Sequence, residues 1–331
     1  MPSSPKRERF IPFRKRDIIN MILDENTIES TGFIKLCQII ESIFHFEFHK
    51  DLEKLKDSYH PINPDLNITR PSAAQASAAD KELYSTLKKI LNDANYDIIP
   101  QEEIDKAFNE SALVAFNVKI DFDEYEYADI YVRGRRTETF ELPRLFGLKR
   151  DEHKHDILER VVLVARLKPT EENPSGATFI KMFKDVPLED LEILFPNSKI
   201  SMSIKDKLMI AIPAVAGGIP LMVTKVVPAL IVAFVIISAY FGVKGSVEED
   251  QLKQAVAVFS ALGALGGFFL KQWSKYKNKK IQFQKELSDN LYFRNLVNNA
   301  GVFYALIDSA EEEECKETFL AYYFLKTSEV R

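Results

Sequence analysis

The amino-acid sequence predicts an α+β membrane protein, in which an N-terminal helical subdomain and a small, mainly antiparallel β-sheet precede a transmembrane helical hairpin and C-terminal helices. Three observations predict this class. Apolar residues first recur at helical spacing, β-rich runs with polar turns follow, and long apolar stretches bounded by lysines come next. With a net charge of -5 and no basic stripe, the sequence gives no case for nucleic acid as a partner.

Residues 1–99 are predicted to form the helical N-terminal subdomain. A proline-rich break at 59–65 ends the first long helix. Ser72 is a candidate N-cap for the next helix, because a serine hydroxyl accepts hydrogen bonds from the free N–H groups of a first turn. The apolar residues that set the helical spacing are Phe33, Leu36, Cys37, Ile40, Phe44, Leu83, Leu87, Ile90 and Leu91.

Residues 100–200 are predicted to form an α+β subdomain with an antiparallel sheet. After Pro100 the sequence changes to β-branched and aromatic runs separated by turn residues. A helix at 188–195 is expected to lead from the sheet towards the membrane region. The strands are expected at 112–120, 128–134, 137–142, 158–167 and 178–183.

Residues 206–270 are predicted to be the membrane region. The stretches 226–243 and 254–270 carry no charged side chain, and we expect each to cross the bilayer as a transmembrane helix. The stretch 206–224 is interrupted by Pro213, Gly217, Gly218 and Pro220, which predicts a broken or re-entrant segment. The alternative is a buried helical hairpin in a large soluble core.

The charges around this region predict its orientation. Lysines flank it on both sides, whereas the short connection at 244–253 contains Glu248, Glu249 and Asp250. By the positive-inside rule, both termini then lie in the cytoplasm. We therefore expect a multi-pass protein of a bacterial inner membrane, or of a mitochondrial membrane if the source is eukaryotic.

The segment that follows the last apolar stretch is a candidate lipid interface. Tryptophan and tyrosine favour the headgroup level, and each lysine near an anionic surface contributes about 1 kcal/mol. The alternative is a plain stop-transfer flank, which also needs basic residues. The predicted interface residues are Trp273, Lys275, Tyr276, Lys277, Lys279 and Lys280.

The stretch 254–270 also has a face of small residues. Gly263 and Gly267 have G-x-x-x-G spacing, with Ser260 and Ala264 beside them, and small side chains let a second helix approach closely. The sequence therefore predicts helix packing at this face and a homo-oligomer through the transmembrane helices.

Residues 271–331 are predicted to form the basic juxtamembrane segment and the C-terminal helices. Ser309-Ala-Glu-Glu312 has the spacing of a capping box, which predicts that a last helix begins there and runs through Leu325. An amphipathic helix before it would carry Ile281, Leu287, Leu291, Val297 and Leu306.

Three polar groups are weaker candidates for a site. His45 and His49, with Glu41 one turn earlier, can place three metal ligands on one helix face, although ordinary packing is the alternative. The acidic residues within 121–129 suit a cation or a solvated turn. Arg133-Gly-Arg-Arg136 suits a phosphate or lipid headgroup, or a basic hairpin turn facing those acidic residues.

Common catalytic signatures are missing from the sequence. It contains no P-loop, dinucleotide fingerprint, nucleophile elbow or zincin motif. We therefore predict no catalytic residue, no cofactor and no metal, and expect that the protein is not an enzyme.

Several blocks of the chain resemble the transmembrane protein 143 family. The resemblance implies a membrane protein of unknown function, mitochondrial in animals and also present in bacteria, without known catalytic residues. It spans nearly the whole chain in the expected order. The blocks are Arg9–Phe13, Tyr59–Asp65, Phe183–Pro196, Asn290–Leu296, Asn298–Glu312 and Ala321–Leu325.

These observations favour a membrane-anchored interaction or scaffold protein with cytoplasmic domains. Its expected partners are anionic lipid headgroups of the bilayer and an unidentified protein. The alternative is an oligomeric transport or channel-like protein that uses the broken segment 208–224. A third hypothesis is a lipid-handling enzyme with the acidic residues near Arg133–Arg136.

Overall fold

The structure is a computed structural model with two compact units. The first unit comprises Met1–Val114, Lys119–Lys199 and Asn290–Arg331, and the second comprises Ala115–Val118 and Ile200–Asp289. The structure describes residues 8–25, 29–66, 71–109, 116–144, 149–170, 176–196, 199–202, 231, 234, 237–238, 240–242 and 249–328.

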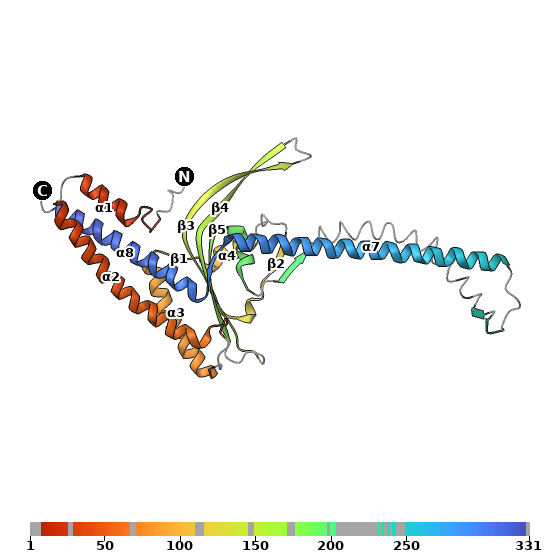
Figure 1. Ribbon diagram of the computed structural model, residues 1–331. Coiled ribbons are helices and arrows are strands. Elements are labelled where there is room, and N and C mark those ends of the chain that lie inside the picture. The colour runs from red at the N-terminus through yellow and green to blue at the C-terminus, as the bar shows by residue number, and fades with distance from the viewer. Residues whose placement is uncertain are drawn as a thin grey trace. The chain divides into compact units, whose positions relative to one another are not determined.

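Helices from both ends of the chain build one layer of the first unit (Figure 1). Ser72 caps α3 as predicted, because its hydroxyl accepts the N–H of Gln75 at 3.4 Å while the Gln75 side chain accepts the N–H of Ser72 at 3.1 Å. This reciprocal capping box fixes the start of α3. The elements of the layer are α1 (Lys15–Asp24), α2 (Ser30–Tyr59), the 3-10 turn η1 (His60–Ile62), α3 (Ala73–Asp93) and α8 (Ala300–Ser328).

A five-stranded antiparallel sheet lies against these helices, with strand order β1-β3-β4-β5-β7. In the β3–β4 pair, Tyr125 lies opposite Leu167 and Arg144 opposite Lys149. The prediction of an α+β fold with an antiparallel sheet is confirmed. The strands are β1 (Asp97–Ile98), β3 (Tyr125–Arg144), β4 (Lys149–Leu167), β5 (Ala177–Pro187) and β7 (Asn295–Asn298).

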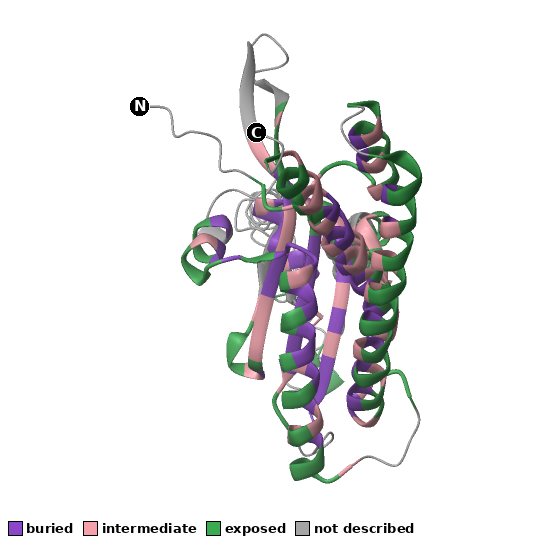
Figure 2. Ribbon diagram, turned by 90° about the vertical axis from the view of Figure 1, so that its left-hand side faces the viewer, coloured by how far each residue is buried: buried purple, intermediate pink, exposed green. Residues whose placement is uncertain are grey.

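Both faces of this sheet are buried in the middle of β4. Successive residues of β4 point to opposite faces, and Val161, Val162, Leu163 and Val164 are all at most 1% exposed. On one face Val162 and Val164 pack with α2, α3 and α8. The 3-10 segment η3 (Leu188–Leu194) contacts β4, β5 and the helix α4 (Gln101–Asn109). Figure 2 looks onto the helical layer and shows its outward faces exposed.

A second apolar cluster joins the N-terminal helices to α8. It contains both cysteines, which are free and buried, and burial raises the pKa of the Cys315 thiol to about 12. This cluster joins residues near the two opposite ends of the chain. The buried members are Ile18, Ile22, Phe33, Cys37, Cys315 and Phe319.

A buried polar network ties α3 to the sheet. The guanidinium of Arg166, 3% exposed, donates to Thr178 Oγ1 at 3.0 Å and to Glu126 Oε2 at 2.8 Å. Its Nη1 also lies 3.1 Å from Asp80 Oδ1 on α3. Tyr127 donates its hydroxyl hydrogen to the same Asp80 oxygen at 3.0 Å. Because each charge has a partner, the cluster can be buried without leaving an isolated charge.

The second unit contains most of α7 (Glu249–Arg294), a helix of 46 residues. At 1.5 Å per residue its length is about 69 Å. Its last residues, from Asn290, belong to the first unit, where β7 follows directly. The short strands β2 (Phe116–Lys119) and β6 (Lys199–Met202) pair with each other.

The prediction of a transmembrane fold is wrong for the part of the chain that the structure describes. Among those residues, no helix has the length and apolar character needed to cross a bilayer. The predicted span 254–270 lies within α7, which continues without a break into the lysine-rich segment 271–280. Most of 226–243 and all of 206–224 lie outside the described residues.

The membrane class and location predicted from the sequence are corrected by the same finding. A multi-pass protein needs helices that bury some 20 mainly apolar residues in lipid. Small and polar residues, such as Gly263, Gly266 and Ser260, interrupt the apolar side chains of α7. The predicted placement in a bacterial inner membrane or a mitochondrial membrane, with both termini in the cytoplasm, is therefore wrong on the described helices.

Three local predictions are also wrong. The chain does not turn at Gly134, which has φ of 80° but lies within the continuous strand β3. Ser309 does not begin a helix, because it lies inside α8 and donates its hydroxyl hydrogen to Ala305 O at 2.8 Å. The predicted amphipathic helix around Val297 is interrupted by β7, which pairs with β5.

Candidate functional site

The outward face of α2 carries a row of exposed apolar side chains, here named the α2 stripe (Ile39, Ile43 and Phe46). Their spacing of i, i+4 and i+7 puts them on one face of the helix. They are 57%, 52% and 61% exposed, respectively. The opposite face of α2 packs inward through Phe33 and Leu55, so the stripe contributes nothing to the core.

Charged and polar side chains border the α2 stripe. Lys35, Gln38, Ser42 and Glu47 line, together with the stripe, a shallow hollow of about 640 Å³. Beyond it, Lys50 Nζ lies 4.2 Å from the centroid of the Phe46 ring. Such an exposed cation–π contact contributes about 0.5–1 kcal/mol. The surface is apolar in its middle, with a lysine at each end and one carboxylate at its border.

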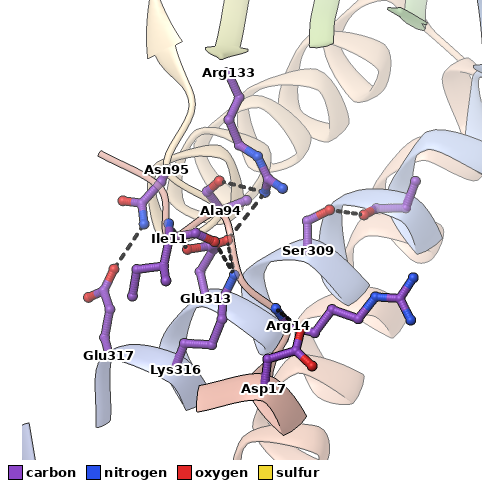
Figure 3. A network of polar contacts seen from close by, with 11 residues as sticks. Ile11, Arg14, Asp17, Ala94, Asn95, Arg133, Ser309, Glu313, Lys316 and Glu317 are labelled. Atoms are coloured by element: carbon purple, nitrogen blue, oxygen red, sulfur yellow. Dashed lines mark hydrogen bonds and ion pairs between the residues drawn. The ribbon is translucent and has the colours of Figure 1, made fainter. Parts of the chain in front are cut away.

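A buried ion pair on α8 lies beside the N-terminal residue Ile11 in space (Figure 3). Lys316 Nζ donates to Glu313 Oε1 at 2.6 Å, and the two residues are 3% and 1% exposed. Arg133 Nη1 on β3 lies 3.9 Å from the same carboxylate oxygen and donates to Ala94 O at 3.2 Å. We name Arg133, Glu313 and Lys316 the Glu313 cluster.

Sequence reasoning missed the Glu313 cluster because Glu313 lies in the acidic run 311–314. The capping-box spacing of 309–312 places that run in the first turn of a helix, where acidic residues are common. A usable signal was present, since Glu313 continues the helical spacing of Phe303, Leu306 and Ala310, all fully buried. A carboxylate at such a core position predicts a buried partner, and Lys316 lies one turn further on.

Buried carboxylates also gather at η3. Asp190, 2% exposed, accepts from Arg294 Nη1 at 3.2 Å, and Glu189 Oε1 lies 3.1 Å from His155 Nδ1. Burial raises the pKa of Asp190, against the charge of Arg294. Burial, with the charge of Asp190, raises the pKa of Glu192 to about 7. The sequence signal is the acidic content of 188–195, a segment for which the sequence analysis predicts only a helix.

The predicted lipid-interface residues all lie on α7. Trp273 is 61% exposed, and its ring centroid lies 6.1 Å from that of Tyr276. Lys275, Lys277 and Lys280 are exposed, and Lys279 is half-buried. The contact of these six residues with anionic headgroups stays a prediction.

The predicted helix-packing residues lie on the same helix. Ser260 donates its hydroxyl hydrogen to Val256 O at 2.8 Å, within α7 itself. Within the part of the chain that the structure describes, a Cβ atom added to Gly263 or Gly267 would meet no atom within 4 Å. Packing of a second helix on this face, including Ala264, stays a prediction.

The predicted third ligand, Glu41, pairs with Lys15 instead of completing a metal site with His45 and His49. His45 Nδ1 lies 3.0 Å from Glu311 Oε2, and Glu41 Oε1 lies 3.7 Å from Lys15 Nζ. The rings of His45 and His49 are 6.4 Å apart. Among the described residues, no group of three or more histidine, cysteine or acidic side chains is placed to hold a metal ion.

The acidic residues at 121–129 separate in the structure. Asp121 accepts from the N–H of Asp123 in η2 (Phe122–Glu124), whereas Glu126 pairs with Arg166. Asp129 accepts from the hydroxyl of Tyr84. These residues therefore form no common cation site.

The arginines at 133–136 lie on β3, not in a hairpin turn, and face other carboxylates than those predicted. Arg135 Nη2 lies 2.6 Å from Glu103 Oε1. Arg136 Nη1 lies 2.8 Å from Asp185 Oδ1. Because carboxylates already pair with these guanidinium groups, the structure gives no support to an anion site here.

The first unit defines the protein as an α+β protein with an antiparallel sheet covered by helices. Residues 158–301 match the model of a family described as a protein of unknown function, DUF3754. The match begins in β4 and ends at the start of α8, so it includes η3 and β7 but neither the α2 stripe nor Glu313. No solved structure matches the chain.

Proposed function

We propose that this chain is an interaction or scaffold protein that binds another protein through the α2 stripe. The observation that carries the proposal is the exposure of Ile39, Ile43 and Phe46 in one row. Burying apolar surface contributes about 25 cal/mol per Å², and a contiguous exposed patch is typical of a binding surface. The shallow hollow along the stripe can receive apolar side chains of a partner protein.

The chemistry of the surface favours an amphipathic helix as its partner. Such a helix presents anchors at i, i+3, i+4 and i+7, and the α2 stripe has three of these positions, i, i+4 and i+7. Lys35 and Lys50, at the two ends, favour acidic residues at the ends of the partner helix. The proposed partner is therefore an acidic amphipathic helix of another protein.

Site-specific photocrosslinking tests this function in cells. A photoreactive phenylalanine analogue at Ile43 is expected to give one discrete adduct, because this position lies in the middle of the stripe. Sequencing the crosslinked peptide should identify an amphipathic helix with acidic residues. The same analogue at Lys81, an exposed position on α3, is the matched control.

The variant Ile39→Lys separates binding from folding. Since Ile39 is 57% exposed, the substitution should change the free energy of unfolding by less than about 0.5 kcal/mol while abolishing the adduct. An adduct at Ile43 no stronger than at Lys81, or one that survives Ile39→Lys, would contradict the proposed function.

We also infer a relationship to the transmembrane protein 143 family. The blocks Phe183–Pro196 and Asn290–Leu296 support it, and both lie inside the range matched by the family of unknown function. The membrane insertion that this resemblance implies is not carried over. The alternative of a transport protein depends on 208–224, outside the described residues, and no observation on the described part favours it.

A further inference from the structure

The N-terminal segment (Glu8–Phe13) lies in contact with residues that are distant in sequence, although it forms no helix or strand. Glu8 Oε1 accepts the main-chain N–H of Arg135 at 3.2 Å. Arg9 donates to Asp97 Oδ1 at 3.0 Å and to Asn92 Oδ1 at 3.2 Å. The first residues of the segment are therefore held by side chains and main chain of the folded domain.

The main chain of Ile11 is held by the buried charges of the Glu313 cluster (Figure 3). Its N–H donates to Glu313 Oε2 at 3.1 Å, and its carbonyl oxygen accepts from Lys316 Nζ at 2.8 Å. One peptide position thus satisfies both members of a buried ion pair. The pair recognises a main-chain donor and a main-chain acceptor, whatever the side chain between them.

These contacts complete the ion pair. Glu313 Oε1 is occupied by Lys316, so Oε2 needs another donor, and the remaining protons of the ammonium need an acceptor. A buried charge with unfilled hydrogen-bonding capacity is costly. The Glu313 cluster is therefore built to receive a peptide group at the place where Ile11 lies.

Side chains of the domain add sequence preference to this main-chain recognition. The guanidinium of Arg133 lies 5.3 Å from the ring centroid of Phe10 and 5.6 Å from that of Tyr96. Asp97 and Asn92 accept hydrogen bonds from Arg9, the residue before Phe10. The side chain of Ile11 packs against the apolar cluster that joins the N-terminal helices to α8. The site therefore selects an arginine, then an aromatic residue, then an aliphatic residue with a free N–H.

The sequence of the segment also favours an extended conformation before binding. Ile11 precedes Pro12, and a residue before proline is restricted to the extended region. An extended segment therefore loses less conformational freedom when it binds. Because Arg9 and Asp97 are half-exposed, their ion pair contributes little affinity and mainly the preference for arginine, whereas the contacts of Ile11 with Glu313 and Lys316 contribute most of the affinity.

We propose that the Glu313 cluster, with Tyr96, Asn92 and Asp97, is a peptide-binding site for extended arginine–aromatic–aliphatic segments, and that the N-terminal segment is its tethered occupant. The site is separate from the α2 stripe and does not depend on the proposed function. A tether holds its ligand at an effective concentration of about 1 mM. If the dissociation constant of the separate peptide were above about 1 mM, the tethered segment would leave the site mainly empty.

The test uses the full chain, folded before any cut is made. A protease site is inserted between Phe13 and Arg14, the folded protein is cleaved, and the far-ultraviolet circular dichroism is compared before and after. A fluorescent peptide of residues 8–13 is then titrated and its anisotropy measured. We expect a dissociation constant below about 1 mM, or a cleaved segment that stays bound and is displaced by excess peptide.

Backbone methylation supplies the matched control. A peptide N-methylated at Ile11 keeps all its side chains but lacks the N–H that Glu313 accepts, so it should bind about tenfold more weakly or worse. A peptide methylated at the exposed Phe13 should bind like the unmodified one. Equal binding of the Ile11-methylated and unmodified peptides, or no binding by either, overturns the proposal.

A measurement on the uncleaved chain covers the case in which cleavage disturbs the fold. Hydrogen exchange at the Ile11 amide should be slow in the intact protein, because Glu313 accepts this N–H in a buried place. Excess unmodified peptide should speed the exchange by displacing the tethered segment. An Ile11 amide that exchanges at the same rate with and without peptide overturns the proposal as well.

Discussion

Replacing Glu192 by glutamine is expected to stabilise the protein at pH 8 and to stabilise it much less at pH 5. Burial and the neighbouring charge of Asp190 raise the pKa of Glu192 from 4.5 to about 7. The folded protein therefore binds more protons than the unfolded chain between these two values. By linkage, the free energy of unfolding falls as pH rises through this window, and the loss is complete above pH 7.

The size of the effect follows from the pKa difference. A shift of about 2.5 units, at 1.36 kcal/mol per unit, corresponds to about 3 kcal/mol at pH 8 and less than about 1 kcal/mol at pH 5. Glu192 keeps partial contact with solvent, which reduces the penalty. We therefore expect Glu192→Gln to raise the free energy of unfolding by about 1–3 kcal/mol at pH 8.

Urea unfolding at both pH values, followed by far-ultraviolet circular dichroism, measures this difference. Fluorescence is less suitable, because the single tryptophan, Trp273, lies in the second unit whereas Glu192 lies in the first. Glu82→Gln is the control, since this carboxylate is 56% exposed and should show no pH-dependent gain. A Glu192→Gln gain that is equal at pH 5 and pH 8 would refute the reasoning.

Three substitutions test the packing of the first unit by urea unfolding. Arg166→Met should lower the free energy of unfolding by about 3–5 kcal/mol, because it leaves the Asp80 carboxylate buried without its cation; a loss below 1 kcal/mol would contradict this. Ser72→Ala should cost about 1 kcal/mol and Ser72→Asp much less, whereas equal losses would show that the capping hydroxyl is unimportant. Gly134→Ala should lower the free energy of unfolding by about 1–2 kcal/mol, since φ is 80° and the added Cβ would lie 2.6 Å from Glu159 Oε2. Adding Glu159→Ala to this variant should restore only the part of the loss that is due to the clash with Glu159.

The sequence was sufficient to predict elements whose residues obey one local pattern. Ser72 followed by Gln75 predicts the start of α3, and the apolar run 158–167 lies within β4, where both faces are buried. Gly134 predicts a turn because glycine usually marks one, whereas in the structure it takes positive φ inside a strand. Strand β7 was missed because its four residues pair with β5, a partner that local spacing does not reveal.

The candidate sites were less accessible to sequence reasoning. Helical spacing places Phe46 on a face of α2, but only the packing of α8 and α3 determines which face stays outside. The Glu313 cluster depends on Ile11, Arg133 and Lys316, which come from three distant parts of the chain. Helical spacing predicts that Glu313 is buried, but only the packing of these three parts shows which groups pair with its charge.

The distance along the chain between Ile11 and Glu313 has a consequence for biosynthesis. Their hydrogen bond joins residues 302 positions apart. At 5–20 residues per second, a ribosome needs roughly 15–60 s to make the second residue after the first. Until α8 emerges, Phe33 and Cys37 on the inner face of α2 lack Cys315 and Phe319, with which they share an apolar cluster in the folded protein. A polypeptide whose translation stops before α8 therefore exposes apolar side chains of α2 that α8 would cover. Chaperones and proteases recognise unfinished chains by such exposed apolar surface.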